Sequence, residues 1–190
     1  MSSPLPESLV ALARAGDEAA LTMLWRELNP ALLRYLRGRI GEGAEDVAAQ
    51  AWLDAARRLS EFEGNDLDFR RWMFTIARHR SIDEVRRRGR RPEDLAARPP
   101  VDPVGRDASA DQVDDLAAAL ALVRRLPPEQ ADAVLLRVVG DLDVAEVAAV
   151  MGRSQGSVRV LVHRGLRRLQ AILEEERVTG VDPTALYREQ

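Results

Sequence analysis

The sequence predicts an all-α protein made of two small helical domains joined by a flexible acidic linker. Apolar residues recur at helical spacing over most of the chain, and no stretch alternates in the way of a strand rich in β-branched or aromatic residues. Residues 92–110 instead combine four prolines with acidic side chains. At 190 residues, the chain is long enough for one or two domains of about 100–150 residues each.

Three helices are expected in the first domain, residues 5–91. They are predicted over Asp17–Ile40, Ala44–Leu59 and Leu67–Arg88 from their apolar stripes. Gly41–Glu42–Gly43 breaks the first helix, and Glu63–Gly64–Asn65–Asp66 has the composition of a turn before the third.

The linker, residues 92–110, has too few large apolar groups to offset the cost of ordering it. Helical periodicity resumes for the second domain, residues 111–173, with breaks at Pro127–Pro128, Gly140–Asp141 and Gly152. A domain this small is marginally able to hold its own core. We expect the tail, residues 174–190, to be disordered.

Residues 144–161 have the pattern of a helix-turn-helix motif. Asp143 and Ser154 are placed to cap its two helices, and Gly152 falls in the turn, where a positive φ is needed. Val158 and Leu161 are spaced to pack the second helix against the first.

Four side chains of this second helix are then predicted to face outward: Arg159, Val160, His163 and Arg164. Arginine suits the paired acceptors of guanine, and a valine methyl group can contact the thymine methyl group in the major groove. Arg167 and Arg168 suit phosphates or simple solvation of the helix. The alternative is a helical hairpin with a solvated basic face, and the coincidence of caps, glycine and basic face favours DNA reading.

Charge is unevenly distributed although the net charge is only −3. Residues 70–91 contain nine arginines and two acidic residues, residues 92–115 contain seven acidic residues and two arginines, and residues 153–168 contain five arginines and no acidic residue. Two basic segments on either side of an acidic one suit a polyanion that is contacted at two places.

Aromatic residues lie among the arginines of the first basic segment. Phe69, Trp72 and Phe74 neighbour Arg70, Arg71 and Arg78, an arrangement that suits melted DNA because bases stack on rings while phosphates pair with guanidinium groups. The alternative, in which Phe69 and Trp72 belong to the core, is favoured about two to one by their helical spacing.

Composition excludes several functional classes. All 28 basic residues are arginine, there is no cysteine, and the two histidines are far apart. Disulfide scaffolds, thiolate metal sites and thiol catalysis are therefore excluded, and we expect no metal, no cofactor and no catalytic residue. No apolar run approaches the roughly 20 residues that span a bilayer, and the N-terminus lacks a signal pattern, so we expect a cytoplasmic protein without membrane insertion.

Taken together, these motifs resemble the extracytoplasmic-function (ECF, group IV) sigma factors of bacterial RNA polymerase, over about Leu9–Leu173. Residues 44–50, 69–78 and 82–88 are similar to the core-binding, promoter-melting and −10-reading segments of that family. Leu126–Pro127–Pro128–Glu129–Gln130 resembles the opening of its −35-reading domain.

The resemblance implies the following site residues. For the polymerase core they are Asp46, Val47, Gln50 and Leu53; for the −10 element and melting they are Asn65, Phe69, Arg71, Trp72, Arg78, His79, Asp83, Arg86 and Arg87; for the −35 element they are Arg153, Ser157, Arg159, Val160, His163, Arg164 and Arg167. Family members commonly carry asparagine where His79 stands, so we expect His79 to change the preferred −10 base.

The resemblance also implies the partners. These are the RNA polymerase core, through its β′ clamp and β flap, promoter DNA and an anti-sigma factor, and we expect a monomer when the factor is free. The linker would follow the RNA exit path of the polymerase, or act as a solvated tether. The alternative function is a stand-alone helix-turn-helix regulator whose first domain senses a ligand or partner; the basic third helix of that domain argues against it.

Overall fold

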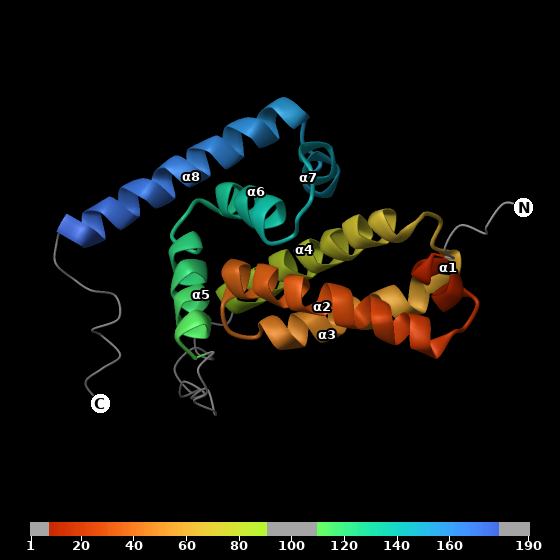
Figure 1. The fold of residues 1–190 in the computed structure, drawn as a ribbon. Helices are drawn as coiled ribbons and strands as arrows, with labels where there is room; N and C mark the ends of the chain where they lie inside the picture. The colour runs from red at the N-terminus through yellow and green to blue at the C-terminus, as the bar shows by residue number, and fades with distance from the viewer. Residues whose placement is uncertain (1–7, 91–109, 179–190) are drawn as a thin grey trace, which may run out of the picture.

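The structure, a computed structural model, describes residues 8–90 and 110–178, and regular structure in these ranges is helical (Figure 1). The elements in chain order are α1 (Leu9–Arg14), α2 (Glu18–Ile40), α3 (Ala44–Arg58), the 3-10 turn η1 (Leu59–Glu61), α4 (Asp66–Arg90), α5 (Ala110–Val123), α6 (Pro128–Val138), α7 (Val144–Met151) and α8 (Gln155–Val178). The predicted linker lies outside the described residues except for Ala110, as do tail residues 179–190.

The three helices predicted for the first domain are confirmed, with ends within two residues of the prediction, and local contacts fix those ends. Asp17 caps α2 by accepting hydrogen bonds from the amides of Ala19 and Ala20, at 2.8 and 3.1 Å. Gly41 and Gly43 have φ values of 67° and 74°, a region that favours glycine, and so they turn the chain from α2 into α3.

Helix α1 was not predicted from the sequence, because six residues are too short for a periodic pattern. Its position depends on Asp66, whose carboxylate accepts hydrogen bonds from the Ser8 hydroxyl at 2.5 Å and from the amides of Leu9 and Val10 at 3.3 and 3.0 Å. Partial burial opposes ionisation of Asp66, but these hydrogen bonds outweigh it and lower the pKa of the carboxyl group. The first turn of α4 therefore anchors α1.

Helices α2, α3 and α4 share an apolar core. Tyr35, Leu32 and Leu36 of α2 and Phe74 and Met73 of α4 are almost fully buried. The rings of Tyr35 and Phe74 meet edge to face with centroids 5.6 Å apart. This core fixes α4 relative to α2.

Helices α5–α8 form the second domain, and the predicted breaks are confirmed. Pro128 occupies the first turn of α6, where the missing amide hydrogen costs nothing. Leu142 is buried between α6 and α7, and Gly152 ends α7. Helix α8 crosses α6 and continues to Val178, five residues past the predicted end at Leu173.

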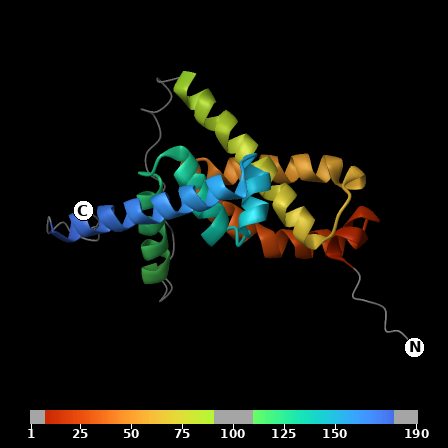
Figure 2. The same ribbon diagram turned by 90° about the horizontal axis from the view of Figure 1, so that it is seen from above.

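The two domains are in direct contact, whereas the sequence predicted two domains on a tether. Helix α2 packs against α5 and α6, and α4 packs against α7. Gly38 of α2 permits this approach, because a Cβ atom there would stand 2.6 Å from Leu135 Cδ2 and 3.0 Å from Leu120 Cδ2. Seen from above, the C-terminal ends of α4 and α8 project from the body in different directions (Figure 2).

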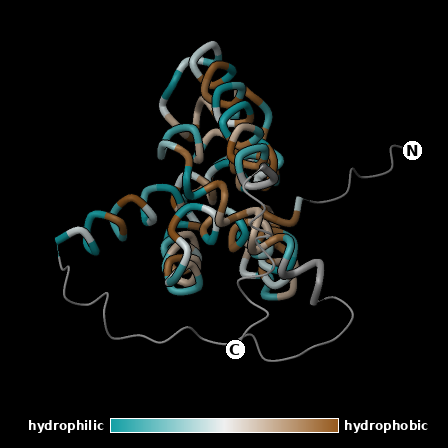
Figure 3. The backbone as a smooth tube through the Cα atoms, turned by 90° about the vertical axis from the view of Figure 1, so that its left-hand side faces the viewer, coloured by the Kyte–Doolittle hydropathy of each residue, from teal (hydrophilic) through white to brown (hydrophobic). Residues whose placement is uncertain are grey.

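Hydrophobic and hydrophilic residues are interleaved along the helices, as amphipathic packing requires (Figure 3). Among the helices in the described part of the chain, none combines the length and apolar character needed to cross a membrane.

Candidate nucleic-acid interface

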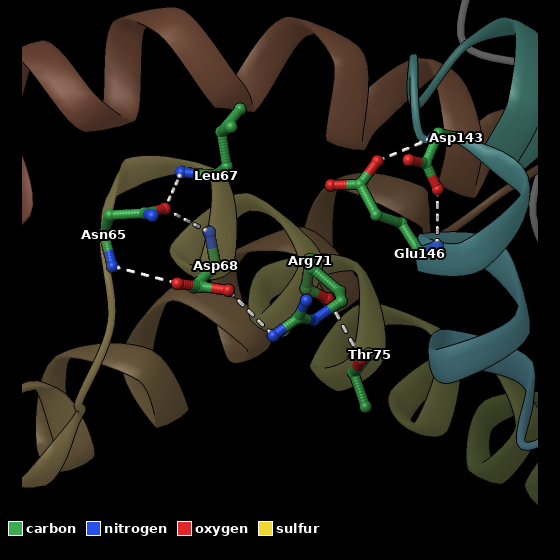
Figure 4. Close-up of polar contacts among 7 residues, drawn as sticks. All are labelled: Asn65, Leu67, Asp68, Arg71, Thr75, Asp143 and Glu146. Atoms are coloured by element: carbon green, nitrogen blue, oxygen red, sulfur yellow. Dashed lines mark hydrogen bonds and ion pairs between the residues drawn. The ribbon is translucent and has the colours of Figure 1, made fainter.

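The helix-turn-helix motif is built from reciprocal caps. Asp143 Oδ1 accepts a hydrogen bond from the Glu146 amide at 2.8 Å, and Glu146 Oε2 accepts one from the Asp143 amide at 2.6 Å (Figure 4). At the other end of α7, Gly152 has φ 63° and ψ 39°, and the Arg153 amide donates to the Ala148 carbonyl oxygen at 3.0 Å. Both predicted roles, the Asp143 cap and the Gly152 turn, are confirmed.

Helix α8 begins at the predicted cap. Ser154 Oγ accepts a hydrogen bond from the Ser157 amide at 3.2 Å and lies 2.9 Å from the Ser157 hydroxyl. Val158 is fully buried and Leu161 is half-buried, so the second helix packs against the rest of the domain as predicted.

The seven residues predicted for −35 reading are all exposed: Arg153, Ser157, Arg159, Val160, His163, Arg164 and Arg167. Val160 retains 47% of its accessible surface, so its methyl groups are open to solvent. Arg153 is paired with Glu129 of α6, and Arg159 lies 3.4 Å from Gln155 Oε1. Helix α8 thus presents several cationic groups to solvent, together with the apolar side chains of Val160, Leu166 and Leu173.

Gly165, which the sequence analysis did not single out, sets the distance between α8 and α6. Gly165 lies where α8 crosses α6, and a Cβ atom there would stand 2.7 Å from Val134 Cγ2. A buried glycine in the middle of a helix lowers helix stability, so its presence signals a close approach. Helix α6 is therefore the platform that holds the exposed face of α8.

Asn65, predicted to contact DNA, forms the N-terminal cap of α4. Its Oδ1 accepts hydrogen bonds from the amides of Leu67 and Asp68 at 2.9 and 3.0 Å, and its own amide donates to Asp68 Oδ2 at 3.1 Å (Figure 4). Asp68 also pairs with Arg71 at 2.9 Å, and Thr75 Oγ1 donates to the Arg71 carbonyl oxygen. Asn65 remains exposed, but its side-chain oxygen already serves the helix.

Phe69 belongs to the core in this structure, which favours the core alternative over its predicted role as a DNA-contacting ring. It is 1% exposed, with its ring centroid 5.6 Å from that of Phe62 and 5.7 Å from that of Trp72. Releasing it would expose a large apolar ring to water. Trp72 is half-buried and stacks on Phe62 with centroids 4.9 Å apart, so part of its ring stays accessible. Phe74, considered alongside them, is also buried.

Beyond Trp72, the residues predicted for the −10 element separate into two groups. His79, Asp83, Arg86 and Arg87 are exposed on the C-terminal half of α4. Asp83 pairs loosely with Arg86 at 3.9 Å, and Arg87 pairs with Glu84 at 2.9 Å. Hydrogen bonds from Arg87 and then Arg88 lower the pKa of Glu84 despite its partial burial. Arg78 differs from this group, because its guanidinium group is turned into the second domain.

Arg88 fastens the end of α4 to the turn between α2 and α3. Its guanidinium group donates to the carbonyl oxygens of Ile40 at 3.3 Å and Glu42 at 2.5 Å. Arg80 and Asp54 make a second link between α4 and α3, at 2.5 Å. The basic helix is therefore held to the turn that precedes α3 and to α3 itself.

Helix α3 presents the residues predicted for the polymerase core. Asp46, Gln50 and Leu53 are exposed at the spacing of one helical face, and Leu53 keeps 48% of its surface. Val47 is 7% exposed and packs into the core, so it offers little surface for the predicted contact with polymerase. Its burial orients the other three residues outward.

The contact between the domains is centred on Asp132 of α6, which is 1% exposed. Asp132 Oδ1 lies 2.5 Å from Arg39 Nε, an ion pair without the linear geometry of a hydrogen bond. Asp132 Oδ2 accepts a hydrogen bond from Arg78 Nε at 3.1 Å, and the Tyr35 hydroxyl donates to Oδ1 at 3.2 Å. The sequence analysis missed this cluster, although an acidic residue on the apolar face of α6 was a signal that could have found it.

Burial is the main influence on the acidic groups of this cluster. It raises the pKa of the Tyr35 hydroxyl well above its usual range, with a further rise from the Asp132 carboxylate, so the tyrosine remains a donor. Burial also raises the pKa of Asp132, and the guanidinium groups of Arg39 and Arg78 oppose that rise.

Two more polar contacts join the domains on either side of Asp132. Arg70 Nε donates to the Gly140 carbonyl oxygen at 2.9 Å, and Arg124 Nη1 donates to the Arg37 carbonyl oxygen at 2.9 Å. Among the described residues, no group of three or more histidine, aspartate or glutamate side chains is arranged to hold a metal ion.

Comparison with known proteins matches each half of the chain to a family. Residues 24–91 match Sigma-70 region 2, and residues 116–169 match Sigma-70, region 4. The first match covers α4, and the second covers the helix-turn-helix motif.

Curated relatives match along most of the chain. The ECF RNA polymerase sigma factor SigD of Mycobacterium tuberculosis is 33% identical over 174 residues, covering 86% of this chain and 82% of the relative. The ECF RNA polymerase sigma factor ShbA of Streptomyces griseus is 32% identical, and the match covers 88% of this chain and 95% of ShbA. BldN of Streptomyces coelicolor is 33% identical, and the match covers 88% of this chain and 66% of BldN.

Solved structures show the same fold. CnrH in complex with the cytosolic domain of CnrY superimposes with a TM-score of 0.67 and 24% identity, over 88% of this chain and 96% of that one. The sigma factor RpoE in complex with the anti-sigma factor NepR from Bartonella quintana gives a TM-score of 0.64 at 24% identity, over 81% and 96%.

Proposed function

This chain belongs to the extracytoplasmic-function sigma factors of bacterial RNA polymerase, and we propose that α3, α4 and α8 carry its contacts with the polymerase core, the −10 element and the −35 element. A sigma factor of this kind is not an enzyme; it directs promoter-specific initiation of transcription. The domain limits 5–91 and 111–173 remain our prediction.

The observation that carries the −35 assignment is the exposed face of α8. The capped α7 and the close crossing at Gly165 hold α8 rigidly, while Arg159, Val160, His163 and Arg164 remain in solvent. We place Arg159 at a guanine edge and Val160 at a thymine methyl group, because these pairings match donor and methyl positions in the major groove. Arg153, Ser157 and Arg167 then lie at the margins, where phosphate contacts are expected.

For the −10 element, we propose the exposed residues along α4. His79 accepts an extruded base, the free part of the Trp72 ring supports it, and Arg71, Arg86 and Arg87 neutralise phosphates. Flipping a base out of a duplex costs a few kcal/mol, which stacking and hydrogen bonds in the new position must offset. Asn65 and Asp83 act by shaping this surface, through the α4 cap and the pair with Arg86.

The polymerase contact is assigned to the exposed stripe Asp46, Gln50 and Leu53, which faces the β′ clamp in this proposal. Leu53 offers an apolar contact beside the polar groups of Asp46 and Gln50, so the stripe combines the two kinds of contact that protein interfaces use. The helix-turn-helix domain would meet the β flap.

An anti-sigma factor is the proposed regulator. It is supported by RpoE, a protein of the same fold that was solved with an anti-sigma factor. Copurification of the chain with a single partner from its host would support this partner, and recovery of the chain from its host without such a partner would contradict it.

Transcription in vitro tests the proposed function. Core polymerase supplemented with the chain should initiate at discrete promoters, and core polymerase alone should not. Leu53→Asp should abolish the complex with core, whereas Ala56→Asp, at another exposed position on α3, should leave it intact. No complex between the wild-type chain and core would contradict the proposal. The stand-alone regulator is not favoured, because the first domain matches Sigma-70 region 2.

A further inference from the structure

The cluster around Asp132 brings together residues from both domains, and of these only Arg78 was among the predicted DNA contacts. Two guanidinium groups and one hydroxyl group from α2 and α4 converge on a single carboxylate from α6. The side chains of Arg39 and Arg78 are only 11% and 15% exposed. The first domain therefore carries a built anion pocket, and the second domain carries the anion that fills it.

Burying three charged groups costs free energy unless the groups pair with one another. Arginine remains protonated in proteins, so removing the carboxylate would leave two half-desolvated cations facing each other. The same reasoning applies when the domains separate, because the pocket then needs another anion or solvent. The pocket lies one residue from His79, at the middle of the helix assigned to the −10 element.

We propose that the pocket of Tyr35, Arg39 and Arg78 is a binding site for a DNA phosphate, and that Asp132 keeps the free factor closed by occupying it. This inference rests on the proposed function for its biological setting, because promoter DNA is the phosphate source it commits to. Guanidinium forks match phosphate oxygens as well as they match a carboxylate, and the Tyr35 hydroxyl can donate to either.

Closure also explains Gly38 and Arg70. The glycine lets α2 approach Leu135 and Leu120 of the second domain, and Arg70 is engaged by the Gly140 carbonyl oxygen instead of a DNA group. Several independent features of the first domain are thus shaped for the second domain.

The state of the free chain can be measured by energy transfer between two labels. The chain has no cysteine, so Ala56→Cys on α3 and Ala171→Cys on α8 give one exposed labelling site in each domain. Asp132→Asn and Arg39→Gln should each lower the transfer efficiency, because the first leaves two buried guanidinium groups without a counter-charge and the second leaves the Asp132 carboxylate with one guanidinium partner instead of two. Asp141→Asn is the matched control, with the same chemical change at an exposed residue of the second domain.

Binding of a labelled single-stranded oligonucleotide of mixed sequence tests the phosphate site separately. Asp132→Asn should bind more tightly than wild type, with a salt slope steeper by about 0.7 for each added phosphate contact. Arg39→Gln should open the chain without this gain, because half of the pocket is lost. Circular dichroism and thermal melting establish that each variant is folded.

Unchanged transfer efficiency in both folded variants would overturn the closure. Opening followed by equal DNA affinities of Asp132→Asn and Arg39→Gln would overturn the phosphate site. If Asp132→Asn fails to fold, the closure is tested on the arginine partner of the ion pair. The transfer efficiency of Arg39→Gln is then compared with that of the charge-preserving Arg39→Lys. None of these readouts uses polymerase, so failure of promoter-specific transcription would remove the proposed function and leave this result standing.

Discussion

Gly165 of α8 lies so close to Val134 of α6 that a Cβ atom at position 165 would stand 2.7 Å from the Val134 Cγ2 atom. Helix α6 is the platform for α8, the proposed reading element of the second domain, and the absence of one methyl group at position 165 permits their close spacing.

Gly165→Ala should therefore destabilise the chain. Overpacking of a core costs about 1–3 kcal/mol, which exceeds the gain of about 1 kcal/mol from replacing a helical glycine. Gly156→Ala is the control, because a Cβ atom at position 156 would meet only Ser154 Oγ, at 3.9 Å. This substitution should therefore stabilise the helix. Urea denaturation measures the free energy of unfolding of both variants. An equal increase in this free energy for the two substitutions would refute the close approach.

Arg159→Ala should relax −35 specificity by about 1–3 kcal/mol at one base pair, as expected for loss of a contact to a base edge. Arg167→Ala should instead weaken binding uniformly across sequences and reduce the salt slope, as a phosphate contact would. The measurement is holoenzyme binding to a library of duplexes varied in the −35 element. An unchanged preference in Arg159→Ala would exclude its base-reading role.

His79→Asn should change the preferred −10 base, because an amide and an imidazole present different donors and acceptors to an extruded base. His163→Asn, at the other histidine of the chain, should leave the −10 preference as it is. Transcription from a promoter library randomised in the −10 element distinguishes the two. Identical −10 preferences in all three proteins would show that His79 does not contact the base.

Asp66→Asn should destabilise the chain near neutral pH, because the carboxylate holds the start of α1 through three hydrogen bonds. The folded-state pKa is lowered, so the contribution of the carboxylate is present above its ordinary value of about 3.9 and is lost as pH falls through the lowered pKa. Thermal melting of wild type and variant should therefore differ at pH 7 and converge in strong acid. A difference that persists at low pH would assign the effect to packing.

Local chemistry made much of the fold predictable. Asp143, Gly152 and Ser154 act within a few residues of their own position, so their caps and turn could be predicted from the sequence. Gly41 and Pro128 end or begin helices for similarly local reasons.

What could not be predicted depends on distant partners. Helix α1 is held by Asp66, and the placement of the two domains depends on Asp132 meeting Arg39 and Arg78. Composition between the domains favoured a tether, and nothing in a single sequence pairs an acid with arginines more than fifty residues away. Phe69 was ambiguous for a related reason, because helical spacing alone does not say whether neighbouring rings cover it.

The link from Arg88 to the carbonyl oxygens of Ile40 and Glu42 has a consequence for how a promoter is found. Because α4 is joined there to the turn that leads into α3, and to α3 itself at Asp54, binding of α3 to the polymerase would also set the direction of α4. The entropic cost of aligning α3 with α4 is incurred when the chain folds, before any DNA binds. In the proposed function, the polymerase would then approach a promoter with α4 already oriented for the −10 element.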